Sequence, residues 1–401
     1  MKIQKSVIAA LVLLASFAGR AQDTTESKFG KGLFNVVAKD SSYSANFTVR
    51  MQSLFTSEWD IPETGDWSDA ETNMLIRRAR LKFKGFAFSP KLEYKLQLGL
   101  SNRDMSGGSE FTRNTPRYIL DAVVMWNFYE NFELWVGQTK LPGNREQLIS
   151  SGSLETVDRS LVNSEFNLGR EMGLQLHHKT NLGGDFIMKE AVSVSQGEGR
   201  NVTQGNIGGH QYMGRLEFLP FGDFDAYSGA DLDREETPKL SLGVSYEYNN
   251  DAVKTESNSG DYMVNDEGFY HTDISTLFLD AMFKYRGFSL MGEYGHRSAD
   301  DAFATNSDGT LTGDVVNIGD GFNLQAGYVF PNDFQVVGRY TTIDLDDQIT
   351  DVVENQYTFA LSKYIVKHKL KVQTDLSYTD LNRNFNDGLL YRLQFLSLIH
   401  I

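Results

Sequence analysis

The sequence predicts an all-β protein, a transmembrane antiparallel β-barrel of about sixteen strands. Three observations lead to this prediction. The chain begins with a short apolar leader, its later segments alternate apolar and polar residues, and long and short connections alternate between those segments. Beyond the leader, no apolar stretch has the length and the lack of charge that a membrane-spanning helix requires.

Residues 1–21 have the composition of a secretory signal peptide. Lys2 and Lys5 precede an apolar run at residues 7–18, and small residues occur at positions 19–21. This order is typical of a leader that is cleaved during export, and not of a membrane helix. We therefore expect the protein to be exported to the cell outer membrane of a Gram-negative bacterium.

The composition excludes several classes of function. The chain has no cysteine, so it can form neither a disulfide nor a thiolate metal site. Its formal net charge of -15 argues against binding of nucleic acid. The 27 Phe and 18 Tyr residues suit the aromatic girdles of a membrane barrel. We expect no metal and no cofactor.

Alternation of side chains is clearest at residues 91–100. Leu92, Tyr94 and Leu96 share one face of a strand, whereas Lys91 and Lys95 lie on the other. One face suits lipid and the other suits water. We expect residues 22–42 to lead into the first strand and residues 43–401 to form the barrel. Similar segments occur at 43–56, 74–86, 91–101, 117–127, 132–139, 170–180, 186–196, 210–219, 239–248, 275–286, 288–295, 321–330, 334–343, 356–365, 368–378 and 388–401.

The connections between these segments differ in length. Eight long polar stretches alternate with short turns such as residues 286–287 and 331–333. Outer-membrane barrels have long loops outside and short turns in the periplasm, so the asymmetry also indicates the orientation. Residues 220–238 break the rule, because this acidic connection is long where a short turn is expected. Either the turn carries an insertion or the strand count is wrong at this point.

The polar face of each strand predicts the charge inside the pore. Cations outnumber acids on this face, although the whole chain is acidic, so the excess acid must lie in the loops. The acids predicted to face inward are Glu93, Asp121, Glu133, Glu217, Asp280, Glu293 and Asp375. The cations are Arg50, Arg78, Arg80, Lys82, Lys84, Lys91, Lys95, Arg215, Lys284, Arg286, Arg339, Lys369, Lys371 and Arg392.

The densest basic run lies at residues 77–84. Arg78, Arg80, Lys82 and Lys84 share one face and form a column, with neighbours roughly 7 Å apart. Such a column could pass an anion from site to site, and the guanidinium fork of arginine suits phosphate oxygens. The alternative is that these cations pair with acids of the lumen wall and have a structural role.

Several stretches resemble the phosphate-selective porin O and P family of outer-membrane channels. The resemblance covers essentially the whole chain after the leader, and residues 136–161 are its most specific part. The matching stretches are residues 30–33 with 43–52, RRARLKFKG at 77–85, VGQTKLPGNREQLISSGSLETVDRSL at 136–161, REMG at 170–173 and GRLEFLPF at 214–221. The chain departs from such barrels at its last residue, which is Ile401 and not an aromatic residue.

The resemblance implies a homotrimer of sixteen-stranded barrels in which the third long loop folds inward and narrows the pore. That loop is residues 140–169, and its serines at 150, 151 and 153 could add hydroxyl donors. Alternatively, Arg159 and Arg170 pair with Glu155, Asp158 or Glu171 and hold the loop in place. The predicted anion-binding and pore-lining residues are Arg78, Arg80, Lys82, Lys84, Lys95, Arg145, Arg159 and Arg170.

These observations favour passive diffusion of small anions, with phosphate or a related oxyanion as the best candidate. A non-selective porin for small hydrophilic solutes is the alternative, and Trp135 is the clearest inward aromatic residue that would favour sugars. An enzyme is disfavoured, because no histidine lies in a motif with a serine nucleophile and no G-x-S-x-G elbow occurs. We expect no catalytic residues. Acidic outer loops could instead serve adhesion, or contact lipopolysaccharide and lipid of the outer membrane.

Overall fold

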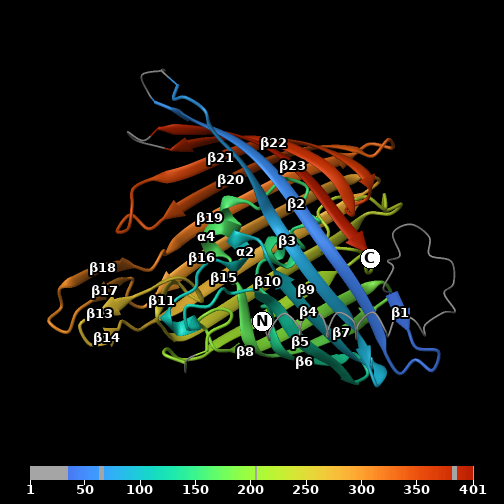
Figure 1. Ribbon diagram of the computed structural model, residues 1–401, viewed down its shortest axis with the longest axis horizontal. Coiled ribbons are helices and arrows are strands. Elements are labelled where there is room, and N and C mark those ends of the chain that lie inside the picture. Colours follow the sequence, from blue (N-terminus) through green and yellow to red (C-terminus); the bar gives the residue numbers. More distant parts are fainter. Residues whose placement is uncertain (1–34, 63–66, 204–205, 382–385, 401) are drawn as a thin grey trace, which may run out of the picture.

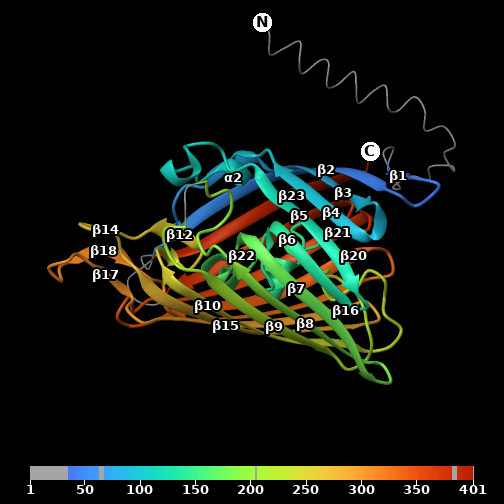
Figure 2. The ribbon, with the colours of Figure 1, turned by 90° about the horizontal axis from the view of Figure 1, so that it is seen from below.

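The computed structural model describes residues 35–62, 67–203, 206–381 and 386–400. These residues form a closed antiparallel β-barrel of sixteen strands, as predicted (Figures 1 and 2). The predicted signal peptide at 1–21, most of the segment at 22–42, and Ile401 lie outside the described residues. The domain boundaries therefore stay a prediction.

Each of the sixteen predicted segments is a strand of the barrel. Every strand pairs with the next along the chain, and β2 closes the barrel by pairing with β23 from Thr48↔His400 to Ile61↔Asp387. A short strand, β1 (Asn35–Val37), extends the sheet beside β2. The barrel strands are β2 (Ser44–Ile61), β3 (Glu71–Ala87), β4 (Ser89–Gly99), β5 (Ile119–Tyr129), β6 (Phe132–Lys140), β7 (Arg170–Gly183), β8 (Phe186–Ser195), β9 (Gln211–Leu219), β10 (Lys239–Ala252), β15 (Thr272–Tyr285), β16 (Phe288–Ala299), β19 (Gly319–Val329), β20 (Phe334–Leu345), β21 (Val353–Val366), β22 (Leu370–Leu381) and β23 (Asp387–His400).

The two faces of the strands differ as the alternation predicts. On β5, Val124, Trp126 and Phe128 are exposed on the outside, while Asp121 and Val123 are buried on the inside. This difference follows from the period of two in a strand, which places successive side chains on opposite faces of the wall. The outer surface is thus apolar, and polar side chains fill the interior.

The connections keep the predicted asymmetry. Short turns join the strands at one end, and Arg286 and Gly287 both have positive φ in the tight turn between β15 and β16. The other end carries the long loops, which contain α2 (Asn102–Met105), η1 (Glu110–Thr112) and three small hairpins. These hairpins pair β11 (Lys254–Glu256) with β12 (Ser259–Tyr262), β13 (Val264–Asn265) with β14 (Gly268–Phe269), and β17 (Phe303–Thr305) with β18 (Leu311–Val315). Within the described ranges, none of the helices has the length and apolar character of a membrane span.

The long connection at residues 220–238 is an insertion in a turn, and the strand count is correct. It joins β9 to β10 at the end of the barrel that carries the short turns. Part of this turn insertion folds back into the lumen, where Ala226 and Ala230 are fully buried. Of the two alternatives that the sequence left open, an insertion in the turn or a wrong strand count, the insertion is therefore the right one.

The third long loop folds into the barrel, as expected. It contains α3 (Arg145–Leu148) and α4 (Leu161–Phe166). Phe166 and Val162 from α4 pack with Phe278 and Ile343 of the wall in a buried cluster. Gly321 makes room for this contact, because a Cβ at that position would lie 2.7 Å from the Phe166 ring.

Candidate functional site

The third loop spans the lumen because its backbone and side chains bond to distant strands. Asn144 donates to Glu293 of β16 at 2.8 Å, and the Val157 amide donates to Asp375 of β22 at 2.9 Å. Lys371, also on β22, donates to the Leu154 carbonyl at 2.7 Å. These bonds fix the loop in place inside the barrel, so it constricts the pore.

Glu155 is a further anchor of the third loop. Its carboxylate is buried and accepts hydrogen bonds from Ser289 at 2.5 Å, Gln325 at 2.6 Å and Gln335 at 2.5 Å. A buried charge is costly unless hydrogen bonds satisfy it, and three strands supply these donors. This part of the loop is therefore held without the arginine partner that the sequence suggested for Glu155.

Cations gather on the inner face of β2, β3 and β4 and form what we call the basic wall. The predicted column is part of it, and the paired strand register places Arg80 beside Arg50 and Lys84 beside Lys95. The members of the basic wall are Arg50, Arg77, Arg78, Arg80, Lys82, Lys84 and Lys95.

Arg77 belongs to the basic wall because of a β-bulge. The register between β2 and β3 shifts so that Gln52 pairs with Arg78 and Ser53 pairs with Ile76. The extra residue of a bulge breaks the strict alternation of faces. Arg77 and Arg78 are both buried, and both bond to Asp158 of the third loop.

Two serines of the third loop contact the basic wall as acceptors. Arg50 donates to Ser151 at 2.8 Å and to Ser150 at 3.0 Å, and Arg80 donates to Ser151 at 3.3 Å. Ser150 and Ser151 therefore lie beside the column, while their predicted role as hydroxyl donors to an anion stays a prediction. Ser153 instead bonds through its backbone carbonyl to the Gly229 amide of the turn insertion at 2.9 Å.

Three carboxylates balance part of the charge of the basic wall. Asp158 lies 2.5 Å from Arg77 and 3.1 Å from Arg78, Asp104 lies 2.5 Å from Arg80, and Asp121 lies 3.3 Å from Lys95. Burial alone would raise the pKa of Asp158, but the charges of Arg78 and Arg77 hold it well below the usual value. Among the described residues, Lys82 and Lys84 have no carboxylate within ion-pair distance.

The remaining predicted site residues hold parts of the structure together. Arg159 donates to the carbonyls of Glu146 at 2.9 Å and Ile149 at 2.8 Å, and burial lowers its pKa to about 10. Arg170 pairs with Asp121 at 3.2 Å. The predicted pairing of these arginines with Glu155, Asp158 or Glu171 is therefore not what the structure shows: Arg159 bonds to carbonyls within its own loop, and Arg170 joins β7 to Asp121 of β5.

Arg145 does not join the predicted column. It is fully buried against β9 and β15, where it bonds to Asp280 at 2.7 Å and to Glu217 at 3.1 Å. Arg215 pairs with the same Asp280 at 2.6 Å. This part of the lumen wall is charged but balanced, so the net positive charge lies on the side of the basic wall.

The sequence pattern did not predict Arg77 or Asp104 as members of the constriction, and it offered Asp158 only as a partner of the arginines near the third loop, not of Arg77 and Arg78. A signal for Arg77 existed, since strict alternation would have pointed this arginine toward lipid, where a charge is costly. No comparable signal marked Asp104 or linked Asp158 to β3, because both aspartates lie in loops whose path the residue pattern does not reveal.

Comparison with known proteins identifies the family to which the chain belongs. The family model for phosphate-selective porin O and P matches residues 49–388. The chain belongs to this family. An uncharacterized protein of Aquifex aeolicus (strain VF5) is 24% identical to the porin over 346 residues, covering 79% of this chain and 78% of the relative.

Solved outer-membrane channels share the fold of the porin at low sequence identity. An anion-selective porin from Comamonas acidovorans has a TM-score of 0.54 with 11% identity and covers 89% of this chain and 100% of its own. The channel DcaP of Acinetobacter baumannii has a TM-score of 0.52 with 12% identity and covers 92% and 100%. The porin is therefore an outer-membrane channel, as family and fold together indicate.

Proposed function

We propose that the porin passes small anions by diffusion, with phosphate or a related oxyanion as the main candidate. The observation that carries this proposal is the pair Lys84 and Lys95. They lie directly opposite each other on β3 and β4, both on the inner face. Like charges in this position repel each other, and Asp121 offsets only part of the charge of Lys95 because it also pairs with Arg170, so an anion between the two lysines lowers the remaining repulsion.

The arginines at the other end of the basic wall have a different role. Arg77, Arg78 and Arg80 are bound to carboxylates of two loops, so their charges fix the constriction in place. Lys82 and Lys84 follow on the same strand toward the short-turn end, and they supply the charge that an anion meets after the constriction. Lysine presents a compact, strongly hydrated charge without the rigid fork of arginine, and conduction requires binding that is weak enough for the ion to leave.

The charge asymmetry of the lumen supports the same proposal. On the other side of the pore, Glu217 and Asp280 balance the charges of Arg145 and Arg215. The basic wall, in contrast, has more cations than its three carboxylates can balance. Fixed charge inside a low-dielectric wall focuses the field and raises the local concentration of counter-ions. A phosphate ion would gain from this field without any conformational change.

The test is the reversal potential of the porin in a planar lipid bilayer across a KCl gradient, followed by titration with phosphate. Chloride preference, together with block of the chloride current by phosphate, is the expected result. Cation preference would contradict the proposal. Chloride preference without any effect of phosphate would contradict its oxyanion part and favour a general porin for small hydrophilic solutes.

A further inference from the structure

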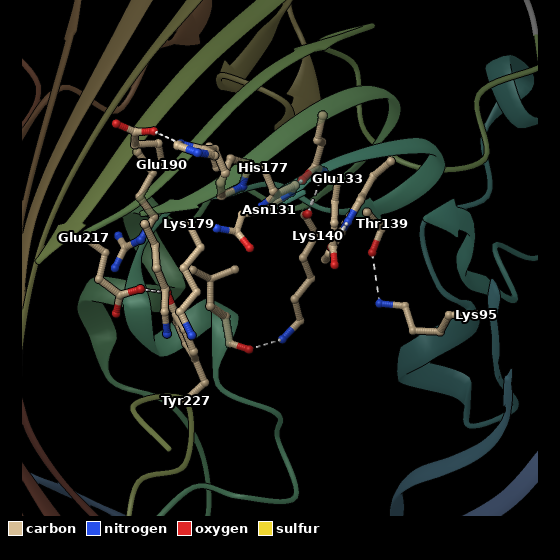
Figure 3. A pocket seen from close by; sticks show the side chains of 18 residues that line it. Lys95, Asn131, Glu133, Thr139, Lys140, His177, Lys179, Glu190, Glu217 and Tyr227 are labelled. Carbon is tan, nitrogen blue, oxygen red and sulfur yellow. Dashed lines mark hydrogen bonds and ion pairs between the residues drawn. The ribbon is translucent and has the colours of Figure 1, made fainter. Parts of the chain in front are cut away.

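A pocket of 430 Å³ lies inside the barrel on the short-turn side of the constriction (Figure 3). Its walls come from β4 and β6–β9, from Pro142 and Leu148 of the third loop, and from Tyr227 of the turn insertion. Asn131, in the turn between β5 and β6, lines it as well. The volume is within the range of small-molecule sites, about 300–1,000 Å³.

One wall of the pocket is an aromatic surface. The Trp135 indole stacks on the His177 imidazole with ring centroids 4.2 Å apart and an interplanar angle of 30°. The indole N–H donates to Glu133 at 3.0 Å, and His177 Nε2 shares a hydrogen bond with Gln175 at 2.9 Å. Both rings are therefore held in fixed orientations by their polar edges. Rigid aromatic faces of this kind bind flat apolar surfaces at low entropic cost.

Tyr227 adds a third aromatic ring, carried by a different element. Its hydroxyl donates to Glu217 at 2.7 Å, and the Arg145 guanidinium lies over its ring, 5.4 Å from the centroid. Figure 3 shows Tyr227, Glu133 and Lys95 entering the pocket from different sides. The turn insertion thus completes the pocket instead of simply closing the end of the barrel.

Cationic groups surround the aromatic rings. Lys95 stands at one side and connects the pocket to the basic wall through its neighbour Lys84. Arg215 also lines the pocket, but it is buried and already paired with Asp280 at 2.6 Å. Lys179 and Lys189 line the pocket as well, and these two cations share the single carboxylate of Asp223 at 2.6 and 2.9 Å, so positive charge remains on the lining.

Carboxylate and amide side chains complete the lining of the pocket. Glu133 and Glu190 present carboxylate oxygens, and Asn131 presents an amide, whereas the Gln175 amide is already bonded to the Lys140 carbonyl and to His177. Carboxylates repel a bare phosphate ion, but they accept hydrogen bonds from hydroxyl groups. The rings likewise offer nothing to phosphate alone. The pocket therefore suits a larger solute that carries hydroxyl groups, an apolar ring face and a negative charge.

We infer that this pocket binds a monosaccharide with an acidic group, of the hexuronate or sugar-phosphate type, during its passage through the pore. The sugar ring lies against a free face of the stack of Trp135 and His177, and its hydroxyls bond to Glu133 and Glu190. Its anionic group faces the lysines of the lining, Lys95, Lys179 and Lys189. The inference rests on the proposed anion passage, and it names a substrate class for the same channel.

The experiment is block of the chloride current in planar bilayers by glucuronate and by glucose 6-phosphate, with glucose, acetate and phosphate as reference solutes. Either acidic sugar, added at the short-turn side, should block at lower concentration than glucose or than the small anion that bears the same group. Trp135→Leu should raise the half-blocking concentration of the acidic sugar by about three- to tenfold and leave phosphate block unchanged.

Trp126→Leu is the matched control, because Trp126 lies on the outer face of β5 and is exposed. His177→Leu serves as the second variant if Trp135→Leu does not fold, and it should weaken the same block. Acidic sugars that block no better than acetate or phosphate would overturn the inference, and so would block that is unchanged in both aromatic variants. The reversal potential separately decides the proposed anion preference, so the two failures are distinguishable.

Discussion

Asp104 in the second outer loop lies 2.5 Å from Arg80 of the pore wall. Arg80 Nε donates to the other carboxylate oxygen at 2.8 Å, so the contact is bidentate. Both side chains are largely buried, and the Arg80 guanidinium, helped by the charge of Arg78, holds the pKa of Asp104 below its usual value against the effect of burial. A loop outside the barrel thus sets part of the charge inside it.

This ion pair predicts a charge rescue. Arg78→Ala with Arg80→Ala removes two cations and leaves Asp104 uncompensated, so the chloride-over-potassium preference should fall. Adding Asp104→Asn should restore part of it, because the uncompensated negative charge is then gone. The measurement is the reversal potential across a KCl gradient. Unchanged selectivity in the double variant would remove the arginine end of the column from the mechanism.

Lys84 and Lys95, which lie opposite each other, predict a larger loss of chloride preference at the other end of the basic wall. Lys84→Gln with Lys95→Gln should lower chloride preference by about threefold for each lysine, as expected for a unit charge about 7 Å from the ion path in water. Phosphate block should weaken in parallel. Lys363→Gln is the control, since Lys363 lies at the end of β21 and bonds to the carbonyl of Asn332. An equal effect of the control variant would argue against a local site.

The strands could be predicted from the sequence, but the constriction only in part. A period of two needs only neighbouring residues, so the faces of β4 and β5 follow directly from the residue pattern. The bulge that turns Arg77 inward depends on the register with β2 and breaks that pattern. The partners of Arg145 depend on contacts between residues far apart in sequence, which alternation does not encode.

Asp158 predicts an acid-sensitive constriction. Its folded pKa is lowered relative to about 3.9 in an unfolded chain, so its contribution to stability is present above about pH 4 and is lost as the pH falls below it. Asp158→Asn should mimic the acid state by loosening the third loop from Arg77 and Arg78. The free energy of unfolding should drop by about 1–3 kcal/mol, and current noise should rise at neutral pH.

The control for this prediction is the pH dependence of the variant. Wild-type current noise should increase on acidification below about pH 4, whereas Asp158→Asn should already be noisy at pH 7 and change less. Urea-induced unfolding in detergent or lipid measures the stability difference. Identical acid responses of the two proteins would show that other carboxylates control the loop.

Arg145 predicts a large stability effect far from the basic wall. Arg145→Ala leaves Asp280 and Glu217 without one shared cation in a fully buried place, and breaking such pairs typically costs about 3–5 kcal/mol. The urea midpoint should fall accordingly. Arg286→Ala, in the exposed turn between β15 and β16, is a suitable comparison and should change stability much less.

The turn insertion predicts a change in conductance. It supports the third loop from the short-turn end of the barrel. The Gly229 amide donates to the Ser153 carbonyl at 2.9 Å, and Arg145 donates to the Ala226 carbonyl at 3.2 Å. Replacing residues 223–235 by a short Asn-Gly turn should remove this support and widen the short-turn end of the pore. Single-channel conductance in KCl should therefore increase. Block by an acidic sugar should weaken at the same time, since Tyr227 is lost with the segment. A variant that folds with unchanged conductance would show that the current path avoids the insertion.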